Sequence, residues 1–186
     1  RYHKPSKVIE IGCGVSTLLI QGALTLNQKE TGQTAEHICI EPYHQPWLEG
    51  VDGIKLVRQK VEDVPISTFS GLSSGDLLFI DSTHIIRPQG DVLFEYLAII
   101  PQLKSGVYVH IHDIFTPRDY LSSWIEEDVR FWNEQYLLEV LLSNSMRYTI
   151  VTSLNHLKHS YYDELKAVCP HLATNGEPGS LYFKVN

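Results

Sequence analysis

Two short segments of the chain combine aspartate with histidine, residue types that can move protons and bind metal ions. Asp81 precedes His84 by three residues, and His112 directly precedes Asp113. Each segment closes an apolar run typical of a buried strand. Strand alternation places His112 and Asp113 on opposite faces. Because ligands of open α/β sheets bind beyond the carboxyl ends of the strands, we expect all four side chains to converge at one reactive site.

A glycine turn follows the first apolar strand pattern, within residues 8–17. Gly12 and Gly14 are separated by one residue, Glu10 precedes them, and a helical pattern follows. This order is typical of the first unit of a doubly wound α/β fold, in which a ligand can touch the backbone of the turn. A tight turn without a ligand gives the same pattern, because an isolated glycine fingerprint is weak.

The rest of the chain alternates strand and helix patterns, which predicts a mostly parallel sheet. Strands are expected over residues 8–12, 37–41, 54–58, 76–81, 106–113, 147–154 and 180–185. Helical segments are expected over residues 16–29, 45–49, 67–72, 91–103, 123–142 and 161–168. The segment 123–142 carries a capping-box spacing and an apolar stripe, which predicts one long helix. The fold class predicted is α/β, doubly wound and Rossmann-like, with helices on both faces.

Composition restricts the class of protein. The 186 residues fit a single domain, 1–186, with 43% hydrophobic and 20% charged residues and no apolar run of membrane-spanning length. A net charge of -7 argues against a nucleic-acid partner, because that binding depends on Lys and Arg. Three widely spaced cysteines without a C-x-x-C motif fit a reducing compartment, so a cytoplasmic location is expected. The chain begins with Arg1 rather than Met, and we expect natural sequence upstream.

Acidic residues recur at successive strand ends beside the glycine turn. Glu10-x-Gly12-x-Gly14, then Glu41, then Asp81 resemble class I S-adenosylmethionine-dependent methyltransferases over essentially the whole chain. Three segments are similar to a bacterial small-molecule methyltransferase group within that class, namely 79–84, 106–115 and 132–138. The resemblance implies a seven-stranded sheet with an antiparallel C-terminal strand, and S-adenosylmethionine as the cofactor.

The resemblance also implies which residues hold the cofactor. Gly12 and Gly14 would let the backbone approach its methionine portion, where a Cβ would clash. Glu10 would bind its ammonium group, or would brace loop amides instead. Glu41 would accept hydrogen bonds from both ribose hydroxyls, and an acid after the third strand, Glu62 or Asp63, would lie near adenine. The expected cofactor contacts are Glu10, Gly12, Gly14, Ser16, Glu41, Glu62 and Asp81.

Methyl transfer from a sulfonium is an in-line displacement that needs a positioned oxygen nucleophile and a base. His84 matches a basic residue that metal-dependent catechol-type relatives carry three positions after their strand-end Asp, so His84 is the expected general base. Asp81, His112 and Asp113 complete the expected catalytic set. Asp81 and Asp113 also match two metal ligands of those relatives, which implies a possible Mg²⁺ site. Ile114 stands where those relatives have an asparagine ligand, so the use of a metal stays open.

The resemblance therefore implies an enzyme that O-methylates a small molecule, such as a sugar or a secondary metabolite. One alternative is an inactive relative that binds the cofactor without transferring methyl groups. A second is an NAD-dependent oxidoreductase, against which Thr17 argues because a complete dinucleotide fingerprint has glycine there. A nucleic-acid base methyltransferase would carry a Pro-Pro-aromatic motif where residues 82–84 read Ser-Thr-His.

Overall fold

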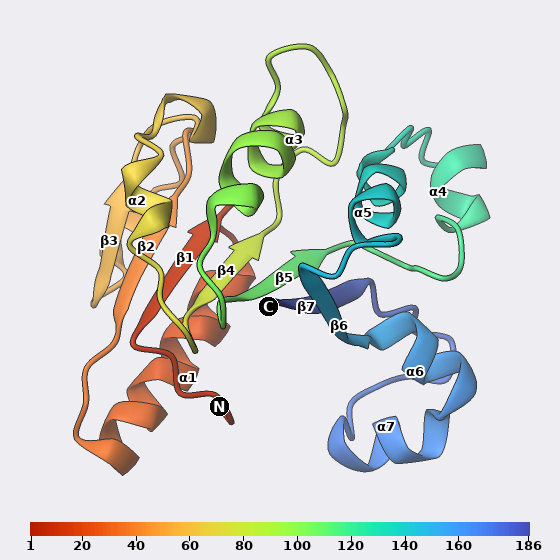
Figure 1. Cartoon of the computed structure of the whole chain (residues 1–186). Coiled ribbons are helices and arrows are strands. Elements are labelled where there is room, and N and C mark those ends of the chain that lie inside the picture. The colour runs from red at the N-terminus through yellow and green to blue at the C-terminus, as the bar shows by residue number, and fades with distance from the viewer.

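Seven strands form one sheet in the order β3-β2-β1-β4-β5-β7-β6 in a computed structural model that describes all 186 residues (Figure 1). The strands are β1 (Lys7–Ile11), β2 (Glu36–Ile40), β3 (Ile54–Val57), β4 (Leu77–Ile80), β5 (Tyr108–His112), β6 (Tyr148–Ser153) and β7 (Ser180–Val185). The first five are parallel, and β7 runs antiparallel to both β5 and β6. The predicted sheet, with its antiparallel C-terminal strand, is confirmed.

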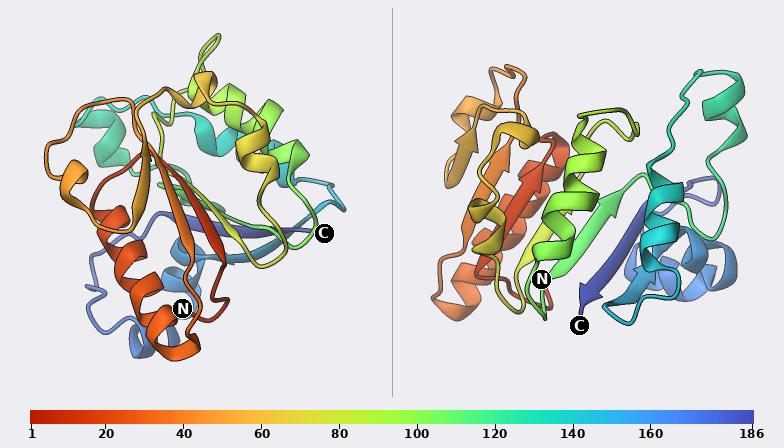
Figure 2. Two further views of the ribbon diagram at one scale, coloured as in Figure 1. Left: turned by 90° about the vertical axis from the view of Figure 1, so that its left-hand side faces the viewer. Right: turned by 45° about the horizontal axis from the view of Figure 1, so that its top comes forward.

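Helices cover both faces of the sheet, as expected (Figure 2). One face carries α1, α6 and α7, and the other carries α2, α3 and α5. The helices are α1 (Val15–Thr31), α2 (Ser67–Ser70), α3 (Asp91–Phe94), α4 (Ser122–Glu126), α5 (Glu134–Leu142), α6 (Leu154–Ser160) and α7 (Tyr162–Val168). A π-helical turn over Glu95–Ile99 and a 3-10 turn over Ile100–Gln102 continue α3, and two further 3-10 turns cover Leu48–Gly50 and Val61–Asp63. None of these helices combines the length and apolar character that a bilayer crossing requires.

The main hydrophobic core lies between the sheet and the helices α2, α3 and α5. Ile9 and Ile11 of β1 pack there with Tyr96 and Leu138, all nearly inaccessible to solvent. The alternate β1 position, Glu10, points to the α1 face, because successive strand residues face opposite sides. The apolar core therefore holds the strands so that their carboxyl ends form one edge.

The prediction of one long helix over residues 123–142 is wrong. Instead α4 ends at Glu126, the chain turns back, and α5 begins at Glu134. Val129 takes a left-handed φ of 54°, and the Trp124 and Trp132 rings meet nearly edge to face at 5.1 Å. The spacing of apolar residues along the chain cannot predict this ring packing, because it is a tertiary contact. The expected capping box is also absent, since no side chain caps α4.

The segment after β6 differs from its prediction as well. The strand ends at Ser153 rather than at 154, and Ser153 becomes the N-cap of α6, accepting a hydrogen bond from the His156 backbone N–H. The sequence pattern predicted only the second of the two helices here, α7. A serine with a polar stretch after it is typical of loops as well as of helix starts, which explains the omission.

Candidate active site

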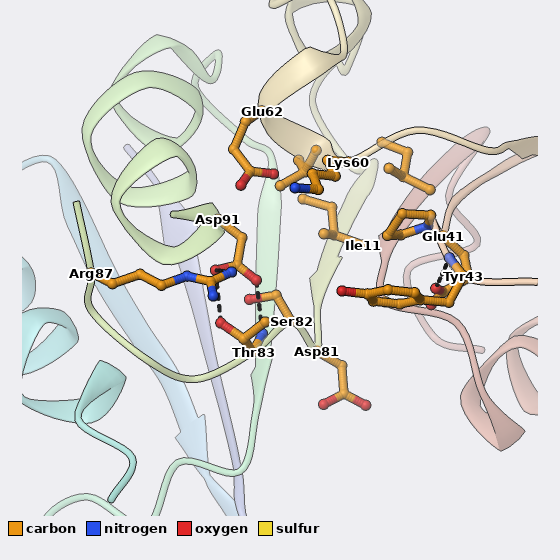
Figure 3. A pocket seen from close by; sticks show the side chains of 14 residues that line it. Ile11, Glu41, Tyr43, Lys60, Glu62, Asp81, Ser82, Thr83, Arg87 and Asp91 are labelled. Atoms are coloured by element: carbon orange, nitrogen blue, oxygen red, sulfur yellow. Dashed lines mark hydrogen bonds and ion pairs between the residues drawn. The ribbon is translucent and has the colours of Figure 1, made fainter. Parts of the chain in front are cut away.

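A cavity of about 310 Å³ opens at the carboxyl ends of β1, β2 and β4 (Figure 3). Glu62 lies at one end of the lining residues and Asp81 at the other, with Glu41 and Tyr43 along one side. Gly12, Glu41, Glu62 and Asp81, four of the expected cofactor contacts, line this cavity, whereas Glu10, Gly14 and Ser16 do not. The volume is at the lower end of the range for cofactor pockets.

Gly12 is needed for a close contact between two strand ends. Its φ is 79°, and a Cβ on it would lie 1.8 Å from the carbonyl oxygen of Asp81. The backbone N–H of Asp81 in turn donates to the carbonyl of Ile11. Gly14 differs, because its φ of -160° is ordinary extended backbone and a Cβ there would meet nothing within 4 Å. Gly12 therefore joins β1 to β4, and Gly14 leaves open space at the start of α1.

The Glu41 carboxylate is held in place at the cavity wall. It is nearly buried, accepts the backbone N–H of Tyr43 on Oε1 at 2.8 Å, and accepts that of Cys13 on Oε2 at 3.2 Å. Each oxygen keeps a further acceptor position, because a carboxylate oxygen has two lone pairs. Glu41 is thus a fixed, bidentate acceptor facing the cavity.

Glu10 does not line the cavity. Its fully buried carboxylate accepts the hydroxyls of Ser16 at 2.7 Å and Thr17 at 3.1 Å, and its other oxygen lies 2.9 Å from His37 Nε2. In this structure the Glu10 carboxylate bonds the hydroxyls at the start of α1 rather than loop amides. Ser16 likewise directs its hydroxyl to Glu10, not to the cavity.

Asp81, His84, His112 and Asp113 lie together, as the strand-end rule predicts. His84 Nε2 is 3.3 Å from Asp81 Oδ1 and 3.7 Å from Asp113 Oδ2. His112 Nδ1 is 3.1 Å from Asp113 Oδ1. The expectation of opposite faces for His112 and Asp113 is wrong, because Asp113 has a left-handed φ of 54° that ends the strand alternation. The four side chains form one carboxylate and imidazole cluster beside the cavity.

Glu134 is a member of this cluster that sequence reasoning missed. Its fully buried carboxylate lies 2.8 Å from His84 Nδ1 and accepts the Tyr96 hydroxyl at 2.9 Å. The backbone N–H groups of Asn133 and Glu134 both donate to the His84 carbonyl. In the sequence, Glu134 lies inside the predicted long helix, where nothing distinguishes it from an acidic residue on the solvent-exposed face of that helix.

Two carboxylates, those of Asp81 and Glu134, determine the charge of His84. Burial would lower its pKa, but hydrogen bonding to Asp81 and Glu134 outweighs burial and raises the pKa to about 10. The contact with Asp113, assisted by Asp81, likewise raises the pKa of His112. In the metal-free protein His84 is therefore an imidazolium at neutral pH, and an imidazolium cannot accept a proton.

The ligand atoms of Asp81, His112 and Asp113 lie within 4.8 Å of one another. His112 Nδ1 is buried and makes no hydrogen bond, although Asp81 and Asp113 are both close to it. Two carboxylates and an imidazole nitrogen are a donor set that suits a divalent cation. His112 therefore offers a nitrogen atom beside the two carboxylates, at a place where the expected asparagine at position 114 is missing.

Residues 9–114 match the model of a family described as a methyltransferase domain. Three solved structures share the fold. The plantazolicin methyltransferase BamL, in complex with a desmethylPZN analog and SAH, is 17% identical over 96% of this chain and 76% of its own, with a TM-score of 0.50. A cmcI structure with SAH is 14% identical over 100% of this chain and 75% of its own, with a TM-score of 0.51.

The third is a putative methyltransferase from Thermobifida fusca YX, 12% identical over 100% of this chain and 74% of its own, with a TM-score of 0.55. No curated protein matches the sequence. The sheet order, the strand-end cavity and the family match define a class I S-adenosylmethionine-dependent methyltransferase. Since the matched residues make up more than half of its length, the chain belongs to the methyltransferase domain family.

Proposed function

We propose that this methyltransferase transfers its methyl group to a hydroxyl of a small molecule. The carrying observation is that one residue, Asp81, both lines the cofactor cavity and belongs to the carboxylate and imidazole cluster. A cofactor extended from Glu62 toward Asp81 would bring its methyl group to that cluster. The net charge of -7 favours a small-molecule acceptor over nucleic acid.

Each expected cofactor residue has a proposed role in this arrangement. Glu41 would accept the two ribose hydroxyls through its fixed oxygens, and Glu62 would lie at the adenine end. Gly12 and Gly14 would border the methionine portion, where open space at Gly14 leaves room for a ligand. Glu10, with Ser16, would act through the turn by bracing the start of α1.

We also propose that the carboxylates of Asp81 and Asp113 hold Mg²⁺, which would keep several of its waters, with His112 beside it. A bound Mg²⁺ would supply a fixed positive charge that orients an acceptor hydroxyl and favours its deprotonation. His84 is proposed as the base that takes that proton, and Glu134 holds its ring in place through Nδ1. A cation shared by Asp81 and Asp113 would weaken their pull on the His84 proton, which reconciles a base with its high pKa in the metal-free protein.

The direct test is methyl transfer from S-adenosylmethionine labelled on its methyl group to a panel of hydroxylated small molecules, including sugars and catechols. We expect label in at least one hydroxylated acceptor, with Mg²⁺ present and S-adenosylhomocysteine as the other product. Cofactor binding without label in any acceptor would favour the inactive alternative. Calorimetric binding of NAD in place of S-adenosylmethionine would overturn the cofactor assignment.

Changing Glu41 to Gln is expected to weaken S-adenosylmethionine binding by about ten- to a hundred-fold, because hydrogen bonds to a charged acceptor contribute about 1.5–3 kcal/mol. Calorimetry measures the change. Glu36→Gln is the matched control. Glu36 is the first residue of β2, the strand that Glu41 follows, so it lies at the other end of that strand, away from the cavity, and its side chain is partly exposed. Equal affinities of the Glu41→Gln protein and wild type would remove the ribose role.

NMR titration of the imidazole C–H signals tests the link between Mg²⁺ and His84. With EDTA present, His84 is expected to stay protonated until pH approaches about 10. Added Mg²⁺ should lower that pKa by about one unit or more, because a nearby cation disfavours the imidazolium. Asp113→Asn should remove most of the response to Mg²⁺. A titration of His84 unaffected by Mg²⁺ would contradict the proposed cation site.

A further inference from the structure

A second cluster of ligand-type side chains lies under the glycine turn, on the α1 face of the sheet. It consists of Glu10, His37 and Cys39, each at most 1% exposed. Glu10 and Cys39 are paired across β1 and β2, and His37 is two residues before Cys39, so all three side chains share one face. The cofactor cavity includes none of them. Fully buried acids and imidazoles are found paired or bound to metals, so this cluster requires a physical explanation.

The spacing of the three ligand atoms fits a tetrahedral metal shell. Zinc bonds of about 2.3 Å to sulfur and about 2.0–2.1 Å to nitrogen or oxygen place neighbouring ligand atoms about 3.3–3.6 Å apart. Here Cys39 Sγ lies 3.4 Å from His37 Nε2 and 3.6 Å from Glu10 Oε2, and the last two atoms are 2.9 Å apart. Only the nitrogen–oxygen distance would have to lengthen, by a few tenths of an ångström.

Neighbouring groups orient the ligands as they do around bound metals. Gln21 donates its amide N–H to the Asp52 carbonyl, which turns its Oε1 toward His37 Nδ1 at 3.3 Å. Nδ1 therefore carries a proton, and Nε2 faces Glu10 and Cys39. Metal-bound histidines typically donate their other N–H in this way, and metal-bound carboxylates are themselves hydrogen-bonded, as Glu10 Oε1 is by Ser16 and Thr17.

We propose that Glu10, His37 and Cys39 form a structural zinc site, and that the Cys13 thiol, which lies outside this group of three, moves toward it to become the fourth ligand. Cys13 is buried and its thiol contacts that of Cys39. Cys13 also lies within the glycine turn, between Gly12 and Gly14. The ion would thus tie the cofactor turn to β1 and β2 from below, on the side opposite the cavity.

The charges and protons of this step balance. Contact with Cys13 and burial raise the pKa of Cys39, so the Cys39 thiol is protonated before the metal binds. Zinc binding breaks two S–H bonds and removes the proton that His37 Nε2 shares with Glu10 Oε2 across 2.9 Å. The three protons go to solvent, and the two sulfurs, Nε2 and Oε2 bind the ion. The resulting site carries one net negative charge, which the N-terminal end of α1, beginning at Val15, favours.

The test is the metal content and spectrum of the full chain produced in medium supplemented with zinc or with cobalt. We expect about one zinc per chain that resists brief EDTA treatment, because a closed four-ligand site exchanges slowly. The cobalt form should show the intense near-ultraviolet band of thiolate bound to Co²⁺. The cluster of Asp81, His112 and Asp113 contains no thiol, so this band cannot come from it.

Cys39→Ser should reduce retained zinc about ten-fold or more and abolish the band, and Cys13→Ser should weaken both. Two control variants should retain both the zinc and the thiolate band. Cys169→Ser removes the exposed cysteine, and Asp113→Asn alters the cluster of Asp81, His112 and Asp113. Folded wild-type protein that retains no zinc and shows no thiolate band would overturn the proposal, even if the variants fail to fold. A band that persists in Cys39→Ser would do the same.

Discussion

Alanine at position 12 is expected to destabilise the fold by about 3–5 kcal/mol, because it combines a left-handed backbone with a steric collision. The new Cβ would lie 1.8 Å from the Asp81 carbonyl oxygen, a backbone atom that cannot rotate away. Relief requires β1 and β4 to separate where they carry the cofactor turn and the reactive cluster. Urea unfolding of wild type and Gly12→Ala measures the loss.

Gly14→Ala is the matched control, because it adds the same methyl group two residues away. A Cβ at Gly14 meets nothing within 4 Å, and the backbone there suits any residue. The expected cost in unfolding free energy is below about 1 kcal/mol, most of it from the weaker N-cap. The same variant should nevertheless weaken S-adenosylmethionine binding if the cofactor approaches this turn. Equal destabilisation by both variants would contradict the steric explanation for Gly12.

Removal of the Glu134 carboxylate is expected to have the second large effect. Glu134→Ala should cost about 3–5 kcal/mol of unfolding free energy, because breaking a buried ion pair strands its partners. The partners are His84 and the Tyr96 hydroxyl, which both bond to Glu134. Glu134→Gln keeps the shape and should cost less, so the difference between the two variants separates charge from packing.

The pH dependence of stability provides an independent measurement on the same pair. His84 has a folded-state pKa of about 10, above its ordinary value of 6.5, so it binds its proton more tightly in the folded protein. The stability that it contributes is fully present below pH 6.5 and is lost as pH rises toward about 10. With EDTA present, the unfolding free energy of wild type should therefore fall over this window more steeply than that of Glu134→Gln. Parallel curves for the two proteins would show that Glu134 does not hold the His84 proton.

The sheet was predictable because its strands are apolar on both faces and end in recognisable residues. Residues such as Ile9 and Ile80 are apolar, so a buried strand is the favourable place for them. The parallel order of the strands follows from the alternation of strands and helices. The meeting of Asp81, His84 and Asp113 followed from the rule that parallel strands end at one edge. These inferences need only local pattern and topology.

The missed features depend on contacts between segments distant in the sequence or on backbone conformations that the residue pattern does not specify. Glu134 contacts His84 across a separation of 50 positions, and no local sequence pattern near either residue predicts this pair. The left-handed turn at Asp113 reverses a side chain that strand alternation had directed elsewhere. Glu10 was predicted to bind the cofactor or to brace loop amides, whereas its partners here, His37 and Thr17, come from a neighbouring strand and helix.

The anchoring of His84 by the first turn of α5 has an evolutionary consequence. The backbone N–H groups of Asn133 and Glu134 fix the loop that carries His84, and α4 contributes no bond to that carbonyl. Insertions or substitutions in the connection between Leu121 and Phe131 can therefore accumulate without breaking these two hydrogen bonds, as long as Trp124 keeps its contact with Trp132, whose ring centroid lies 4.3 Å from that of His84. A lineage could change its acceptor preference by remodelling this connection while inheriting the reactive cluster intact.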